Sequence, residues 1–83
     1  MAYKIGDEVL IRSKEWFEAQ DKNEMGGAKV NHFTMMSKDM TFYCGMHASI
    51  ISAREIEGTE IKHFKIKIMD QVIPGNWSSE MFE

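Results

Sequence analysis

The sequence predicts a mainly β protein, a small antiparallel barrel with one short helical insertion after the first strand. Two observations support this fold class: several short stretches alternate apolar and polar residues, and turn-forming residues separate them. With 83 residues, the chain is expected to form a single domain over residues 1–83, because it is too short for a second core.

The first strand is expected in "KIGDEVLIRS", where Val9 and Ile11 alternate with their neighbours after a glycine–aspartate turn. Ser13 is predicted to cap a short helix over residues 14–20, because a serine side chain can accept a hydrogen bond from the first helical turn. Residues 21–32 contain two glycines and no apolar periodicity, which predicts an exposed loop.

A second strand is expected over residues 46–55, after a turn in which Ser37 caps the chain and Met40 lies beside an aromatic pair. In this strand Ala48 and Ile50 are predicted to face the core, because alternate side chains of a strand point to opposite sides. The opposite face then carries His47, Ser49 and Ile51.

The clearest alternation lies in residues 61–70, "IKHFKIKIMD", which predicts a third strand. One face of this strand is expected to carry Phe64, Ile66 and Ile68. The other face is expected to carry Lys65, Lys67 and Met69.

The C-terminal part is expected to turn at Pro74-Gly75 and to end in a short strand that contains Trp77. Ser79 is predicted to cap a final turn that carries Met81 and Phe82. These three apolar side chains are expected to close one end of the barrel.

Charge and composition restrict the class of protein. Ten basic and thirteen acidic residues give a net charge of −3, which makes nucleic-acid binding unlikely because phosphate contacts need a basic footprint. A single cysteine favours a reducing compartment, such as the cytoplasm. The N-terminus resembles no signal peptide, and no apolar run is long enough to cross a membrane, so no membrane association is expected.

The pair Cys44 and His47 is interpreted as part of a turn and not as a catalytic or metal site. Residues three apart on a strand point to opposite faces, and a zinc site would need two further ligands. A calcium-like loop that begins at Asp21 lacks an oxygen ligand at Met25 and at His32. We therefore expect no metal, no cofactor and no enzymatic activity.

Two groups of residues are candidates for binding a partner or ligand. Lys65 and Lys67, next to Lys62, are typical of a solvated sheet face or of a protected edge strand. Alternatively they form an anion-binding surface, with His63 adjacent and with Tyr43 or Trp77 as a stacking platform. His47 is a further candidate for binding a partner or ligand.

The second group is apolar. Trp16 and Phe17 are adjacent, so one is expected in the core and the other partly exposed, close to Met35 and Met36. With the outward-facing Ile51, this surface is expected to bind a partner or a second copy, and we predict a homodimer or higher homo-oligomer.

Three stretches, Gly6-Asp7-Glu8-Val9, Tyr43-Cys44-Gly45-Met46 and Trp77 through Glu83, are similar to a widespread family of small, mostly uncharacterised proteins from bacteriophages and bacteria. The resemblance covers most of the chain except residues 21–31, although family members usually carry lysine in place of Met46. It implies a Src-homology-3-like (SH3-like) barrel and a viral or mobile-element origin, and it implies no chemistry.

From these observations we expect a non-enzymatic binding protein of bacteriophage type. Its expected role is to inhibit or sequester a host protein, such as a component of antiviral defence. The alternative is an oligomeric barrel that captures a small anionic, nucleotide-like ligand.

Overall fold

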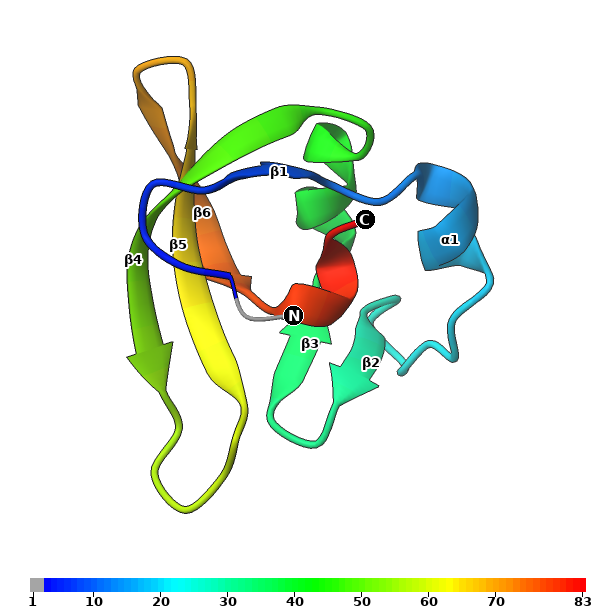
Figure 1. Ribbon diagram of the computed structural model, residues 1–83. Coiled ribbons are helices and arrows are strands. Elements are labelled where there is room, and N and C mark those ends of the chain that lie inside the picture. The colour runs from blue at the N-terminus through cyan, green and yellow to red at the C-terminus, as the bar shows by residue number, and fades with distance from the viewer. Residues whose placement is uncertain (1–2) are drawn as a thin grey trace.

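Figure 1 shows the computed structural model of the chain, which describes residues 3–83. A four-stranded antiparallel sheet has the strand order β1 (Glu8–Leu10), β4 (His47–Glu55), β5 (Lys62–Ile68) and β6 (Gln71–Trp77). A separate hairpin pairs β2 (Ala28–Asn31) with β3 (Thr34–Met36). The helical elements are α1 (Lys14–Glu18) and the two 3-10 helices η1 (Lys38–Tyr43) and η2 (Ser79–Met81).

The sheet curls around one core and forms a small antiparallel barrel that is not closed. After η2 the chain returns to the first strand, where Phe82 forms an antiparallel bridge with Ile11 and the Glu83 amide donates to the Leu10 carbonyl oxygen at 2.8 Å. Within residues 3–83, β1 and β6 are not paired with each other, so the barrel stays open between them. The predicted mainly β class is confirmed, with α1 inserted after the first strand as expected.

The start of the helix confirms the predicted cap. The Ser13 Oγ accepts a hydrogen bond from the Trp16 amide at 3.2 Å, which satisfies one of the free N–H groups of the first turn. The helix ends at Glu18, and the Lys22 ammonium donates to the carbonyl oxygens of Phe17 and Gln20 just beyond it. Lys22 therefore satisfies carbonyl groups that the end of a helix leaves free.

The prediction of an exposed loop over residues 21–32 is wrong in its second half. There Ala28 begins β2, pairs with Met36 of β3 and is fully buried. The preceding residues form a tight turn in which the Asn23 Oδ1 accepts hydrogen bonds from the amides of Met25 and Gly27, both at 2.9 Å. The four residues of this strand do alternate apolar and polar side chains, but so short a run beside two glycines gives too weak a signal to distinguish a strand from a loop.

The predicted turn at Pro74-Gly75 is also wrong. The chain reverses at Met69 and Asp70, between the paired residues Ile68 and Gln71, and Pro74 and Gly75 lie inside β6. They lie in an irregular part of the β5–β6 pairing, where proline and glycine are tolerated because the regular hydrogen-bond ladder is interrupted. The final 3-10 helix is preceded by Ser78, one residue before the predicted cap.

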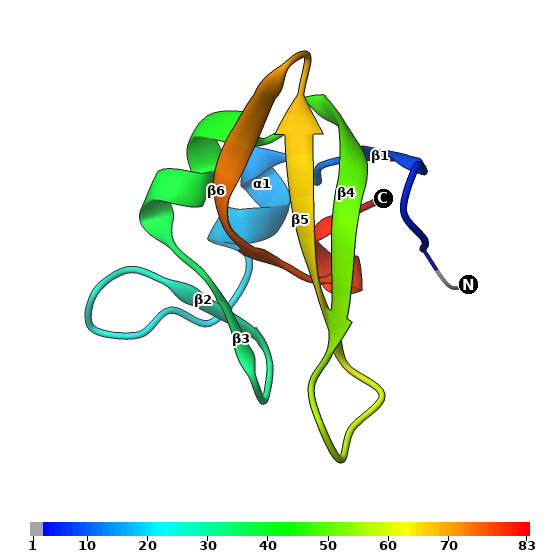
Figure 2. The ribbon, with the colours of Figure 1, turned by 90° about the vertical axis from the view of Figure 1, so that its left-hand side faces the viewer.

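The core lies between the inner face of the sheet and the elements that cover it, and Figure 2 shows β4, β5 and β6 side by side with α1 behind them. The predicted closure of one end by Trp77, Met81 and Phe82 is confirmed, because all three side chains are buried. The rings of Trp77 and Phe82 stack with centroids 6.5 Å apart. Of the inward residues predicted for the two long strands, Ala48, Ile50, Phe64 and Ile66 are buried and Ile68 is half-buried.

Candidate functional site

The turn that contains Cys44 is held by backbone hydrogen bonds. The Cys44 amide donates to the Thr41 carbonyl oxygen, and Gly45, in a left-handed conformation with φ 82°, donates to Ile11. Burial raises the pKa of the Cys44 thiol, against a smaller lowering effect of Lys14, so the thiol is protonated at neutral pH. His47 is exposed, with its Nδ1 3.7 Å from Glu8 Oε1. Among residues 3–83 no three side chains of metal-ligating type form a cluster.

On the outward face of the main sheet, β4 and β5 carry basic residues, whereas β1 places the exposed carboxylate of Glu8 opposite Ser49. The register places Ser52 opposite Lys65, Arg54 opposite His63 and Ser49 opposite Lys67. Because Phe64 and Ile66 point into the core, these alternating neighbours point away from it. We call the surface of Arg54, Lys65 and Lys67 the cationic face; His63 lies next to it.

The position of β5 removes one explanation for these lysines. The strand lies between β4 and β6, so Lys65 and Lys67 are not on an edge strand and do not protect an edge against aggregation. No acidic residue occupies the outward positions that face one another across Ser49 to Arg54 and His63 to Lys67. Without Arg54, Lys65 and Lys67, the rest of the chain has seven basic and thirteen acidic residues, a net charge of −6.

The side chains of the cationic face and of the neighbouring His63 differ in how they are held. The Lys65 Nζ donates to the Gly75 carbonyl oxygen at 3.0 Å. His63 Nε2 lies 2.9 Å from the Thr34 Oγ1, so this histidine links the sheet to the β2–β3 hairpin. Within residues 3–83, Arg54, Lys65 and Lys67 form no ion pair with a carboxylate. Arg54 is exposed and Lys67 is half-buried, and unlike Lys65 neither makes a side-chain hydrogen bond in this part of the chain, so both keep their donors for a partner.

The other residues that the sequence indicated for binding lie outside the cationic face. Trp77 has no exposed surface and its partner in the register is the inward-facing Phe64, so the prediction that Trp77 provides a stacking platform beside the lysines is wrong. Tyr43 is half-buried, with its ring 6.4 Å from that of Trp77. Ile51 lies at a register irregularity of β4 and is half-buried.

The predicted aromatic pair on α1 is confirmed in its burial, but the apolar surface around it is smaller than expected. Phe17 is in the core, whereas Trp16 is half-buried and the Arg12 guanidinium lies 5.3 Å from its ring centroid. Met36 is fully buried and only Met35 is exposed. Trp16 is thus partly covered by a cation, which reduces the apolar area it offers to a partner.

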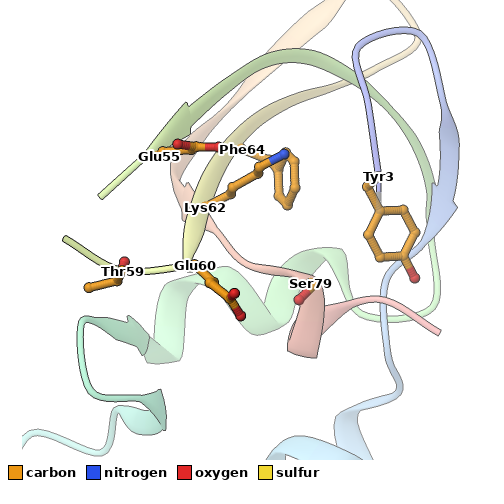
Figure 3. A pocket seen from close by; sticks show the side chains of 7 residues that line it. All are labelled: Tyr3, Glu55, Thr59, Glu60, Lys62, Phe64 and Ser79. Atoms are coloured by element: carbon orange, nitrogen blue, oxygen red, sulfur yellow. The ribbon is translucent and has the colours of Figure 1, made fainter. Parts of the chain in front are cut away.

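A pocket of about 480 Å³ lies beside the loop that joins β4 to β5. Figure 3 shows the seven side chains that line it. It is lined by Tyr3, Glu55, Thr59, Glu60, Lys62, Phe64 and Ser79. Glu55 and Lys62 are partners in the register, and the rings of Tyr3 and Phe64 meet edge to face. The Thr59 hydroxyl is already bonded within its own loop. Carboxylates and an ammonium group share this pocket, so its lining does not select one sign of charge.

An apolar hollow of about 500 Å³ lies at the opposite end of β5, beside the turn to β6. We call it the hairpin-tip surface; it is lined by Phe42, Tyr43, Met46, Ile68, Met69, Asp70, Gln71 and Ile73. Phe42 is 75% exposed and Met69 is 89% exposed. Sequence reasoning missed this surface, because Met69 was expected in a strand and Phe42 beside Met40.

One ionisable group connects the hairpin β2–β3 to η2. The Asn31 Nδ2 donates to Glu80 Oε1 at 3.1 Å. Burial alone would raise the pKa of Glu80, but its hydrogen bonds, including this one, outweigh burial and keep the pKa below its usual value. Glu80 is therefore ionised at neutral pH and has a structural role.

Comparison of the chain with protein-family models, with curated proteins and with solved structures gave no match. Among residues 3–83, no helix has the length and apolar character that crossing a membrane requires.

Proposed function

We propose that this protein is a non-enzymatic binding module that docks through its cationic face on an acidic surface of another protein. The observation that carries the proposal is a group of cations, with no acidic residue among them, on the outward side of the two inner strands β4 and β5 of an acidic chain. Such a face attracts partners of opposite charge and repels others, which gives specificity and speeds association.

The shape and composition of the face favour a protein over a small anion. Small-molecule sites are concave and largely apolar, whereas the two hollows described above lie at the ends of β5, away from this face. No tryptophan, tyrosine or phenylalanine occupies its outward positions, so a nucleotide would find no ring to stack on. Serines at positions 49 and 52 add hydrogen-bonding groups between the cations.

A protein partner is also favoured over nucleic acid. The net charge of −6 on the rest of the chain repels a polyanion of high charge density more strongly than it repels a local cluster of carboxylates. The resemblance to bacteriophage proteins supports a partner in the bacterial host. The role that we propose is inhibition or sequestration of that host protein, such as one of antiviral defence.

Binding to a glutamate-rich peptide and to a DNA duplex, each over a range of salt concentrations, tests the proposal. We expect the peptide to bind at low salt and to weaken as salt rises, because screening shortens the range of the attraction. The double variant Arg54→Glu and Lys67→Glu should bind at least about tenfold more weakly. The matched control, Lys29→Glu with Lys38→Glu, makes the same charge change at exposed positions outside the face.

Two outcomes would overturn the proposal. One is peptide binding that the control weakens as much as the Arg54 and Lys67 variant does, because the effect would then reflect net charge alone. The other is tighter binding of the DNA duplex than of the peptide, which would assign the face to nucleic acid.

A further inference from the structure

The turn between β5 and β6 contains an unusual residue. Met69 has φ 57° and is the one non-glycine residue within residues 3–83 with a positive φ. This left-handed conformation costs a residue with a Cβ about 1–2 kcal/mol, and two-residue hairpin turns favour glycine, asparagine or aspartate there. Its side chain is 89% exposed, so packing in the core does not compensate for the strain. The two-residue turn needs the positive φ but not a methionine, so an exposed apolar side chain at a position that favours glycine is a reason to look for a function outside the fold.

An apolar hollow lies next to the Met69 side chain. The hollow of about 500 Å³ beside it is lined by Phe42, Tyr43, Met46, Ile68 and Ile73. Phe42 is itself largely exposed, and its ring meets that of Tyr43 edge to face at 5.3 Å. A projecting apolar side chain and an apolar hollow therefore lie next to each other on one surface.

We propose that two copies of this chain associate about a two-fold axis through the hairpin-tip surface, with Met69 of each copy entering the hollow beside Phe42 of the other. A two-fold contact joins the same patch on both subunits, so the patch must carry both the projection and the hollow that receives it. The hairpin-tip surface meets this requirement without any change of fold.

Charge favours a second copy as the occupant. In a two-fold contact the same patch meets itself, so a strongly charged patch would oppose like charges, and a patch with few charges is the one that suits such a contact. Asp70 is the single charged residue in the lining of the hollow. A foreign partner of opposite charge would instead be attracted by charged groups, which the cationic face supplies and this surface does not.

The two surfaces are compatible in one assembly. Ile68 and Ile73 line the hollow and lie on the core side of the β5–β6 hairpin, whereas Lys65 and Lys67 point to the opposite side. The dimer thus leaves both cationic faces free, and two linked binding sites raise the apparent affinity for a partner that offers two acidic surfaces. The inference itself does not depend on the proposed function.

The small size of the hairpin-tip surface limits the affinity that we expect for the dimer. Eight residues line the hollow in each copy, compared with about 20–30 residues a side in a standard interface. We therefore expect a weak dimer, with a dissociation constant of about micromolar or above.

Sedimentation velocity over a wide range of protein concentrations tests the inference. Wild-type protein should shift from monomer to dimer as its concentration rises. Met69→Gly should weaken the dimer at least about tenfold while its Tm stays the same or increases, because glycine accepts φ 57° without strain. Phe42→Ser, at an exposed position, should weaken the dimer in the same way.

The matched control is Met25→Ser, which removes an equally exposed methionine from a different loop and should leave the dimer unchanged. Wild-type protein that remains monomeric at every concentration would overturn the inference. So would a dimer that persists in both the Met69→Gly and Phe42→Ser variants, because its interface would then lie elsewhere.

Discussion

At the scale of single residues, Cys44 shows how packing determines the chemistry of a side chain. The cysteine is half-buried and packs against the core, and burial raises the pKa of its thiol. The thiolate is the reactive form of cysteine, so a raised pKa makes the residue less nucleophilic. His47, three residues on, lies near Glu8 and is exposed to solvent. Cys44 and His47 therefore have different neighbours and do not form a catalytic or metal-binding pair.

We therefore predict that Cys44 is chemically inert and functionally dispensable. Its alkylation by iodoacetamide at pH 7 should be slower than that of free cysteine, and the rate should increase as the pH rises toward the raised pKa. Cys44→Ala should lower the free energy of unfolding by about 1–2 kcal/mol at most, with no change in binding to the glutamate-rich peptide. Loss of peptide binding in a variant with unchanged Tm would contradict this interpretation.

At the scale of elements, β6 shows how a strand accommodates residues that usually end one. Between the pairs Phe64–Trp77 and Ile66–Ile73 the register is irregular, and Pro74 and Gly75 occupy the additional positions. The Trp77 Nε1 donates to the Pro74 carbonyl oxygen at 3.3 Å, and Gly75 has φ 104°. The irregularity lets the strand continue until Trp77 reaches the core.

Replacement of Gly75 in β6 by alanine, compared with the same change at Gly58 in the β4–β5 loop, separates backbone strain from side-chain packing. A Cβ at Gly75 would lie 3.3 Å from the buried Met40 Cε, whereas a Cβ at Gly58, with φ 81°, would meet no atom within 4 Å. Both changes should destabilise the fold by about 1–2 kcal/mol through their positive φ. Gly75→Ala should show a further loss, because Met40 must repack.

Thermal unfolding monitored by circular dichroism measures the difference between the two variants. The expected order of Tm is wild type, then Gly58→Ala, then Gly75→Ala. Equal Tm values for the two variants would show that Met40 moves aside without loss, and that the packing against Gly75 is loose.

At the scale of the whole molecule, the C-terminal segment determines whether the barrel holds together. Trp77, Met81 and Phe82 are all buried, and the chain after η2 is bonded to β1 on both sides of Ile11. Arg12 donates from its amide to Met81 at 2.9 Å, and its Nε donates to the Glu80 carbonyl oxygen at 2.8 Å. The ends of the described chain thus lie in contact, although they are distant in sequence.

Deletion of residues 77–83 is expected to abolish folding. Loss of one buried tryptophan or phenylalanine costs about 3–5 kcal/mol, which is comparable with the whole stability of a core this small. The truncated chain should give no cooperative thermal transition and a collapsed near-ultraviolet circular dichroism signal. A cooperative transition in that chain would mean that the core is complete without its C-terminal aromatic residues.

Local rules of sequence determined a large part of this structure. The alternation in β5 and in the first half of β4 was enough to predict that Ala48, Ile50, Phe64 and Ile66 are buried, but the register irregularity at Ile51 reverses the two faces of β4 beyond it. The Ser13 cap was predictable because it depends on neighbours within one helical turn, and so was the burial of one ring of the Trp16 and Phe17 pair, although the sequence did not say which. The lysines of the candidate site were found in this way.

Only the tertiary structure decided the features that depend on contacts between distant segments. The sequence alone determined the antiparallel, mainly β class and the two faces of β5. The central position of β5, the burial of Trp77 away from the lysines and the pairing of β2 with β3 required the fold. The hairpin-tip surface also required it, because η1 and the β5–β6 turn, which lie far apart in sequence, line it together. Periodicity reports the environment of a residue along its own element, whereas strand order and hollows are set by how elements pack together.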